Sequence, residues 1–283
     1  MKLGACLALA ASVWLSAQPA AAQPITIGTS HSIASKPLGE ARTINVVLPA
    51  SYASETKRRY PVLYVIDGGV GQDLLHVAGT AQLGAIWGRS QEAIVVGIET
   101  RDRRRELVGP TRDAELLKKY PTAGSSAAFR AFIRGEVKPL VARTYRVDGH
   151  DAVIGESLAG LFIVETWVRE PRLFGSYAAI DPSLWWDKEA LSRAAARSIG
   201  AAQSGHPLYV AIAKEQIEER APADRLMTAV LRGPTRWCLN PRGDLGHATI
   251  YHTLTPEALQ FLLPPAEAPP PEFGFEVKCS PKS

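Results

Sequence analysis

The feature that most constrains the fold is the segment Gly155-Glu156-Ser157-Leu158-Ala159-Gly160. An apolar run at 151–154 precedes it, and a longer apolar stretch at 161–168 follows it. The segment is close to the pattern G-x-S-x-G of a nucleophile elbow, with Ala159 at the last position and Gly160 one residue later. In such an elbow, a strained turn between a buried strand and a helix exposes the serine at the end of the strand. The two glycines lack the Cβ that would block the close approach of strand and helix. The pattern therefore predicts Ser157 as a nucleophile, and the alternative is a plain glycine-rich turn.

The periodicity of the chain predicts an α/β protein. Continuous apolar runs of strand length alternate with helical patterns, which is typical of a mostly parallel sheet covered by helices on both faces. We expect antiparallel strands at 25–33 and 43–48, further strands at 60–66, 93–98, 151–154, 175–180, 207–213 and 235–239, and helices at 70–87, 126–145, 161–168, 187–199, 224–231 and 255–263. Neither an internal repeat nor a long linker divides the sequence, so 23–283 is expected to form one domain, with a Pro-rich tail from about 264.

A serine nucleophile needs a histidine base, and in this type of fold the base follows the nucleophile in the chain. His247 stands in a Gly-rich loop before the predicted last helix, which is the expected position. His252 is a weaker alternative, and the histidines before Ser157 are interpreted as surface or core residues.

The acid that orients the base is expected after the strand that ends at Ala213. Glu215 is nearest to that strand end and is the preferred candidate. Glu218 and Glu219 are alternatives, and Asp244 is a minor one. A Ser–His dyad without an acid also stays open.

The oxyanion hole is expected to use two backbone N–H groups. The amide of Leu158 lies at a helix N-terminus, where a negative charge is stabilised. The second donor is expected from the loop after strand 60–66, with Gly69 preferred over Gly68, while the Asp67 side chain is expected to hold that loop.

Arginines and tryptophans follow two further strands at the same edge of the sheet. Arg104 and Arg105 belong to a cluster of five arginines between 101 and 112 that could bind an anionic substrate, and the alternative is an exposed basic loop. Trp185 and Trp186 are predicted to form a wall of the substrate pocket, or else to fill core.

The N-terminus predicts export. Residues 1–22 have the pattern of a secretory signal peptide: a positive residue, Lys2, then an apolar run at 3–15 and the small residues Ala20-Ala21-Ala22 before cleavage. We therefore expect the mature protein in the periplasm or outside the cell. The run is too short for a membrane span of ~20 residues. After cleavage only Cys238 and Cys279 would remain, and they are expected to form a disulfide, the alternative being two free thiols.

Several segments together carry a family resemblance. They are 61–68, 95–98, 103–107, 155–160, the stretch Asp181-Pro182-Ser183-Leu184-Trp185-Trp186, and Gly246-His247. In combination they resemble the Putative esterase (esterase D-like) family of α/β-hydrolases, close to periplasmic ferric-siderophore esterases, over about residues 30–263. The resemblance implies an α/β-hydrolase fold, a serine nucleophile at Ser157 and a histidine base at His247. The sequence departs from the family at Asp181, where serine is common, and at Ala213-Lys214, where a Gly-Glu pair is common.

These observations predict an exported serine esterase that acts on a small-molecule ester through an acyl-enzyme, with no metal or organic cofactor. The resemblance implies that the ester is a ferric-siderophore trilactone. The net charge of +4 is too small to indicate a nucleic-acid partner. The alternatives are an acyltransferase on the same scaffold and a non-catalytic exported binding protein.

Overall fold

The computed structural model describes residues 22–268, apart from 220, 232 and 234, together with residues 270, 272, 277 and 279. The predicted signal peptide therefore lies almost entirely outside the described residues. The described helices include none that is long and apolar enough to cross a membrane.

A twisted sheet of eight strands runs through the described part of the chain, in the order β1-β2-β4-β3-β5-β6-β7-β8. Its strands are β1 (Thr29–Ser35), β2 (Glu40–Val47), β3 (Tyr60–Ile66), β4 (Ile94–Ile98), β5 (Val147–Glu156), β6 (Ser176–Ile180), β7 (Leu208–Ala213) and β8 (Trp237–Arg242). The pairs β1–β2 and β2–β4 are antiparallel, and all the others are parallel. The predicted mostly parallel sheet is thus confirmed, and the parallel strands end at one common edge.

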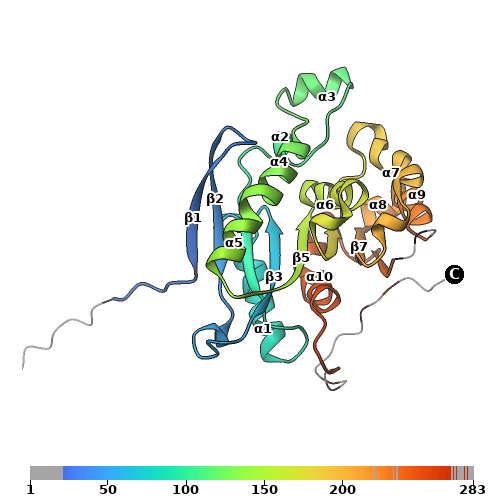
Figure 1. Cartoon of the computed structure of the whole chain (residues 1–283). Coiled ribbons are helices and arrows are strands. Elements are labelled where there is room, and N and C mark those ends of the chain that lie inside the picture. Colours follow the sequence, from blue (N-terminus) through green and yellow to red (C-terminus); the bar gives the residue numbers. More distant parts are fainter. Residues whose placement is uncertain are drawn as a thin grey trace, which may run out of the picture.

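Helices cover both faces of the sheet (Figure 1). They are α1 (Leu74–Ile86), α2 (Arg103–Glu106), α3 (Ala114–Lys119), α4 (Ser126–Phe132), α5 (Lys138–Thr144), α6 (Leu158–Arg169), α7 (Trp186–Ser198), α8 (Lys214–Glu219), α9 (Ala221–Val230) and α10 (His247–Leu262). One apolar core lies between the sheet and α4, α6 and α9, and a second lies between the sheet and α1 and α10. Alternate residues of β3 point to the two cores, since Tyr64 belongs to the first and Leu63 to the second.

Several elements differ from the expectations drawn from the sequence, and the short helices α2, α3 and α8 were not expected. The last helix was expected to begin at Thr255, but α10 begins at His247 and includes Pro256. Proline removes one N–H from the helical ladder, and the long apolar face of α10 against the sheet outweighs that loss. The helix expected over 126–145 contains a π-helical turn at Ile133–Val137 between α4 and α5.

Cys238 and Cys279 form a disulfide with the sulfur atoms 2.11 Å apart, as expected. Cys238 lies in β8 and is fully buried. The bond therefore attaches the C-terminal tail to the edge of the sheet.

Close contacts explain the glycines of the elbow. A Cβ on Gly155 would lie 2.7 Å from the Cβ of Ala159, and a Cβ on Gly160 would lie 3.0 Å from the carbonyl oxygen of Ile180. Both separations are shorter than normal van der Waals contact, and the second involves backbone that cannot move aside. The strand, the turn and the helix can therefore pack this closely only because both positions lack a side chain.

We expect Gly155→Ala to destabilise the fold by about 1–3 kcal/mol through overpacking of the elbow. Gly135→Ala is the matched control, because a Cβ at this position meets nothing within 4 Å. Thermal unfolding of both variants measures the difference. An unchanged melting temperature for Gly155→Ala would contradict the packing argument.

Candidate active site

Ser157 is held on a strained turn between β5 and α6. Its backbone has φ 60° and ψ −116°, in a region that residues other than glycine seldom occupy. Its N–H donates to the carbonyl of Ile180 at 3.0 Å, and its own carbonyl accepts from Leu161 at 2.9 Å. The Oγ atom lies 3.2 Å from the Oγ of Ser183, at hydrogen-bond distance. The turn thus presents the hydroxyl at the edge where the parallel strands end, as the sequence predicts.

His247 is the first residue of α10 and shares a cavity of about 360 Å³ with Ser157. Its Nδ1 atom lies 2.5 Å from Oδ2 of Asp181. Because a carboxylate only accepts, Nδ1 carries the proton in this pair, and Nε2 is left as the basic nitrogen. The imidazole is half exposed, whereas the Asp181 side chain is only 3% exposed.

Asp181 is fixed by several hydrogen bonds directly after β6. Its Oδ1 accepts from the N–H of Ala213 at 2.8 Å and from Nε2 of Gln216 at 2.5 Å. Its own N–H donates to the carbonyl of Ala211 at 2.8 Å. These bonds leave Oδ2 directed at the imidazole, so the carboxylate orients the ring. The hydrogen bond to Asp181 raises the pKa of His247 above its ordinary 6.5, and burial opposes this effect.

The acid expected from the sequence, Glu215, occupies a different place. Its Oε2 accepts from the backbone N–H of His247 at 3.3 Å, so it contacts the main chain and not the imidazole. Glu215 is the second residue of helix α8 after β7, while Asp181 follows β6, the strand directly beside β5. The prediction of Glu215 as the partner of Nδ1 is therefore replaced by Asp181.

The other candidates for base and acid lie elsewhere. Glu218 is exposed on α8, and Asp244 forms an ion pair with Arg242 at 2.6 Å. His252 stacks on His76, with ring centroids 5.1 Å apart. The departure from the family pattern at Asp181, visible in the sequence, was the signal that could have identified the orienting carboxylate.

The two expected oxyanion donors differ in availability. Leu158 is the first residue of α6 and lines the cavity, and an amide at this position has no acceptor within its own helix. The N–H of Gly69 instead donates to Oε1 of Gln72 at 2.8 Å. Gly69 can therefore face a substrate only after that hydrogen bond opens, which the sequence did not predict.

Only some arginines of the cluster line the cavity, and others form contacts elsewhere. Arg103 and Arg104 line the cavity. Arg103 pairs with Asp67 at 2.9 Å, and the guanidinium of Arg104 lies over the ring of Tyr120, 4.5 Å from its centroid. Arg105 was expected beside Arg104 in the substrate pocket, but its guanidinium forms an ion pair with Glu40. Successive residues of a helical turn point in different directions, and this separates Arg105 from the cavity.

The two tryptophans also separate. Trp185 lines the cavity and is 45% exposed, as expected for a pocket wall. Trp186 is 5% exposed, and its Nε1–H donates to the carbonyl of Gly109 at 3.4 Å. The prediction of Trp186 as a pocket residue is corrected, because its ring fills the core beside Tyr120.

Glu156 is a site feature that the sequence did not single out. It directly precedes Ser157, and its Oε1 is buried without a hydrogen-bond partner among the described residues. Burial raises the pKa of Glu156 to about 7, although the nearby His247 acts in the opposite direction. The carboxyl is thus half-protonated close to neutral pH, a short distance from the candidate base.

The groups of the cavity are those of acid–base and nucleophilic chemistry. Within the described ranges, no group of three or more His, Cys, Asp or Glu side chains is arranged to hold a metal ion. The site combines a serine at the end of a strand, a histidine and a buried carboxylate, which come from three neighbouring segments. This combination is typical of the active site of an α/β-hydrolase.

Comparison with known proteins agrees with this class. A family model described as "Putative esterase" matches residues 35–228, and the chain belongs to this family. Ferri-bacillibactin esterase BesA of Bacillus subtilis is 26% identical over 257 residues, which cover 80% of this chain and 86% of BesA. A siderophore triacetylfusarinine C esterase of Aspergillus fumigatus is 28% identical over 168 residues, which cover 53% of each protein. An IroE-like serine hydrolase from Shewanella oneidensis superposes with a TM-score of 0.73 at 22% identity, covering 83% of this chain and 80% of that structure.

We expect Asp181→Asn to lower kcat for ester hydrolysis by about 10³–10⁴-fold, because the asparagine no longer fixes the tautomer of His247. The base must be neutral to act, so activity rises as the pH passes the pKa of His247. Since Asp181 raises that pKa, the acid limb of the kcat/KM profile is expected to move to lower pH in the variant. Stopped or continuous assays from pH 5 to 9 measure both effects.

Glu215→Gln is the comparison variant for this experiment. Its carboxylate accepts from the backbone N–H of His247 and raises the pKa of His247 less than Asp181 does, so a loss below tenfold and a smaller shift of the acid limb than in Asp181→Asn are expected. A greater loss in Glu215→Gln than in Asp181→Asn would assign the orienting role to Glu215 instead.

Proposed function

We propose that this protein is a serine esterase that cleaves carboxylic esters through an acyl-enzyme, with Ser157 as nucleophile, His247 as base and Asp181 as the orienting acid. The observation that carries the proposal is the 2.5 Å contact between Asp181 and His247 in the same cavity as the elbow serine. Membership in the esterase family supports the reaction class.

The Ser157 hydroxyl is the attacking group. Its Oγ lies within hydrogen-bond distance of Ser183 Oγ, and either hydroxyl can be the donor in that pair. Nε2 takes the hydroxyl proton as Oγ attacks the ester carbonyl, and Asp181 stabilises the resulting imidazolium. The N–H of Leu158 donates to the oxyanion of the tetrahedral intermediate.

The second half of the reaction uses the same groups. As the intermediate collapses, the imidazolium gives its proton to the leaving alkoxide, and the acyl group stays on Oγ. His247 then takes a proton from water, which attacks the acyl carbon, and returns that proton to Oγ as the carboxylic acid leaves. Protons and electron pairs balance over the cycle without a co-reactant.

The substrate is proposed to be an anionic ester of the siderophore type. Arg103 and Arg104 bring two guanidinium groups to the cavity, which also contains the carboxylates of Asp181 and Glu215. Of the two arginines, Arg103 is paired with Asp67, so Arg104 is the one proposed to meet the anionic group. Trp185 adds an apolar wall. The relatives named for ferri-bacillibactin and for triacetylfusarinine C support this substrate class, because both names denote siderophores.

Export to the periplasm or the cell exterior completes the proposal. The segment 1–22 has the pattern of a cleavable signal peptide. The Cys238–Cys279 disulfide supports an oxidising compartment. Mass spectrometry of the secreted protein would give an N-terminus near Gln23 if cleavage occurs there.

The nucleophile is tested by covalent labelling. A fluorophosphonate should phosphonylate Ser157 Oγ with loss of fluoride, and peptide mapping should locate the adduct on this residue. Ser157→Ala should abolish labelling and lower kcat by at least about 10³-fold. Ser183→Ala, which removes only the hydroxyl at hydrogen-bond distance from Ser157, should retain labelling.

The same assay separates the alternatives. A non-catalytic binding protein would show neither labelling nor turnover. An acyltransferase would form an ester with an added alcohol faster than it releases acid, which product analysis detects. Labelling of another residue in the wild-type protein would contradict the assignment of Ser157.

The arginines provide a test of the substrate class. We expect Arg104→Gln to raise KM for an anionic ester by about tenfold, the value of one charge-assisted hydrogen bond, and to leave KM for a neutral ester of the same acyl group nearly unchanged. Arg105→Gln is the matched control, since Arg105 pairs with Glu40 outside the cavity. The ratio of the two KM values is the measurement, because it cancels general damage to the site. Equal ratios in Arg104→Gln and wild type would remove the argument for an anionic substrate.

A further inference from the structure

A second cavity, of about 720 Å³, lies at the opposite end of the parallel strands from Ser157. We call it the α5–β5 cavity, because residues of α5 and of the start of β5 line it together with the end of α6 and the turn that follows. From Asp151 in its wall to Ser157, β5 covers six residues, or about 20 Å at the rise of a strand. The α5–β5 cavity is therefore separate from the candidate active site.

Its size and walls suit a small organic molecule. Ligand cavities commonly have volumes of about 300–1,000 Å³ and are lined mainly by apolar groups with a few polar ones. Val62, Val141, Pro171 and Leu173 supply apolar walls. The apolar part of a ligand would thus be removed from water here.

Tyr64 supplies a buried donor at this cavity. The residue is 2% exposed, and its ring packs on Phe174 with centroids 5.4 Å apart. It lines the cavity, and the described hydrogen bonds include none to its hydroxyl. Burial raises the pKa of Tyr64 above its ordinary value, so the phenol keeps its proton and can donate. The hydroxyl is thus a donor in the cavity wall, and a ligand oxygen can accept its hydrogen bond.

The acceptors of the cavity are already used. Asp151 accepts from Lys138 at 2.6 Å and from the N–H of Gly175 at 2.7 Å. Glu170 accepts from Arg130 at 2.9 Å and also pairs with Arg134. A ligand would therefore have to bring its own acceptor.

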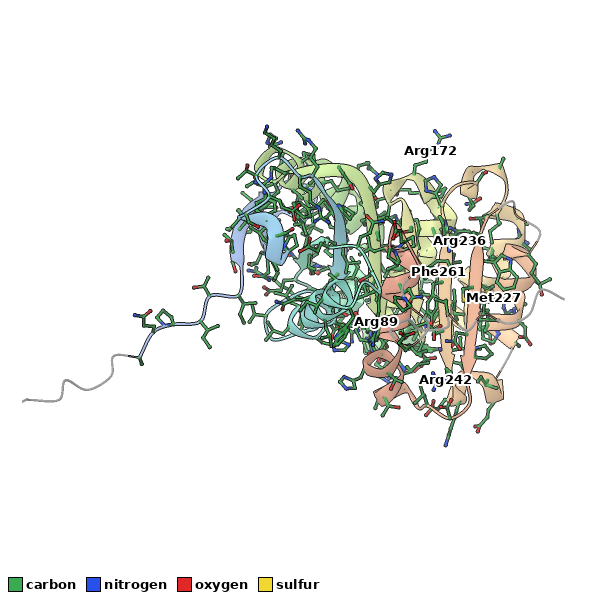
Figure 2. All side chains as sticks on the ribbon, turned by 90° about the horizontal axis from the view of Figure 1, so that it is seen from below. Arg89, Arg172, Met227, Arg236, Arg242 and Phe261 are labelled. Carbon is green, nitrogen blue, oxygen red and sulfur yellow. A yellow bond between two sulfur atoms is a disulfide. The ribbon has the colours of Figure 1, made fainter. Side chains whose placement is uncertain are left out.

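Positive charge exceeds negative charge around the α5–β5 cavity. Four cationic side chains and two carboxylates line it. The cations are Arg134, Lys138, Arg169 and Arg172, and the carboxylates are Asp151 and Glu170. Arg172 is exposed, and its guanidinium has no ion pair among the residues that the structure describes. Figure 2, seen from below, shows Arg172 extending outward from this side of the molecule. It is thus placed at the mouth, where it can meet an anionic group.

We propose that the α5–β5 cavity is a second binding site, for an organic carboxylate with an apolar body, whose carboxylate accepts hydrogen bonds from Tyr64 and Arg172. The apolar body lies against Val62, Val141 and Leu173. Aromatic and alkyl carboxylates share this chemistry, so benzoate and octanoate serve as the two probes.

The experiment is calorimetric titration of the full chain with benzoate and with octanoate. Benzyl alcohol and octanol are the uncharged controls, and they should bind at least about tenfold more weakly because they lack the charge. A higher affinity for one of the two acids shows whether the cavity favours an aromatic or an alkyl group. Equal affinities for the acids and the alcohols would show that the cavity binds only the apolar group, and would overturn the proposal.

Variants locate the binding. Tyr64→Phe, which keeps the ring against Phe174, and Arg172→Gln should each weaken the acid about tenfold. Arg143→Gln is the matched control, since Arg143 is an exposed arginine of α5 outside the cavity lining. Thermal unfolding without ligand verifies that the variants are folded.

A second control excludes the candidate active site, which also contains arginines. Arg104→Gln should leave the affinity for both acids unchanged. If Arg104→Gln abolishes binding while Tyr64→Phe does not, the acids bind beside Ser157 and the proposal is wrong. No binding of either acid to the wild-type chain would also overturn it. The outcome does not depend on whether Ser157 is the nucleophile.

Discussion

Three strands lie side by side in the sheet, β3, β5 and β6, and each is directly followed by a non-glycine residue with positive φ. These residues are Asp67 at 61°, Ser157 at 60° and Asp181 at 42°. Such backbone conformations cost of order 1–3 kcal/mol each and persist only where the surroundings over-determine them. Hydrogen bonds to the neighbouring strands hold two of these turns. The N–H of Ser157 donates to the carbonyl of Ile180, and the N–H of Asp181 donates to the carbonyl of Ala211. The parallel register thus places three strained turns at one edge, and each turn directs a polar side chain toward the same region.

A buried ion pair determines which arginines reach that region. Arg42 of β2 donates to both carboxylate oxygens of Glu106 at 2.7 Å, and both side chains are fully buried. Breaking such a pair by removing one partner is strongly destabilising, because it leaves an unpaired buried charge. Glu106 is the last residue of α2, so the pair fixes the orientation of this single helical turn. With the turn fixed, Arg103 and Arg104 line the cavity and Arg105 faces Glu40.

The sequence predicted the strained turn at Ser157 well because its signal is local. Gly155 and Gly160 on either side of the serine, with a strand before them and a helix after them, are sufficient to predict this turn, and chain order predicts that His247 lies near it. The orienting acid was not predictable in the same way. Glu215 and Asp181 both follow predicted strands, and the choice between them depends on which strand lies beside β5 and on where α8 begins. Periodicity does not give the order of the strands in the sheet, so the carboxylate after the later strand, Glu215, was predicted as the acid and Asp181 was not.

Glu156 connects the strained turn to the pH behaviour of the site. Burial raises its pKa to about 7, and a nearby negative charge on Glu156 is one of the influences that raise the pKa of His247. The two groups therefore titrate over overlapping ranges and influence each other. When Glu156 is protonated, its contribution to the pKa of His247 is absent, and when His247 is protonated, Glu156 loses its proton more readily. The apparent pKa values of such a pair belong to the pair and not to either residue. The residue before Ser157, which the elbow pattern leaves variable, thus affects the protonation of His247, because the turn buries its carboxyl where its charge acts on the imidazole.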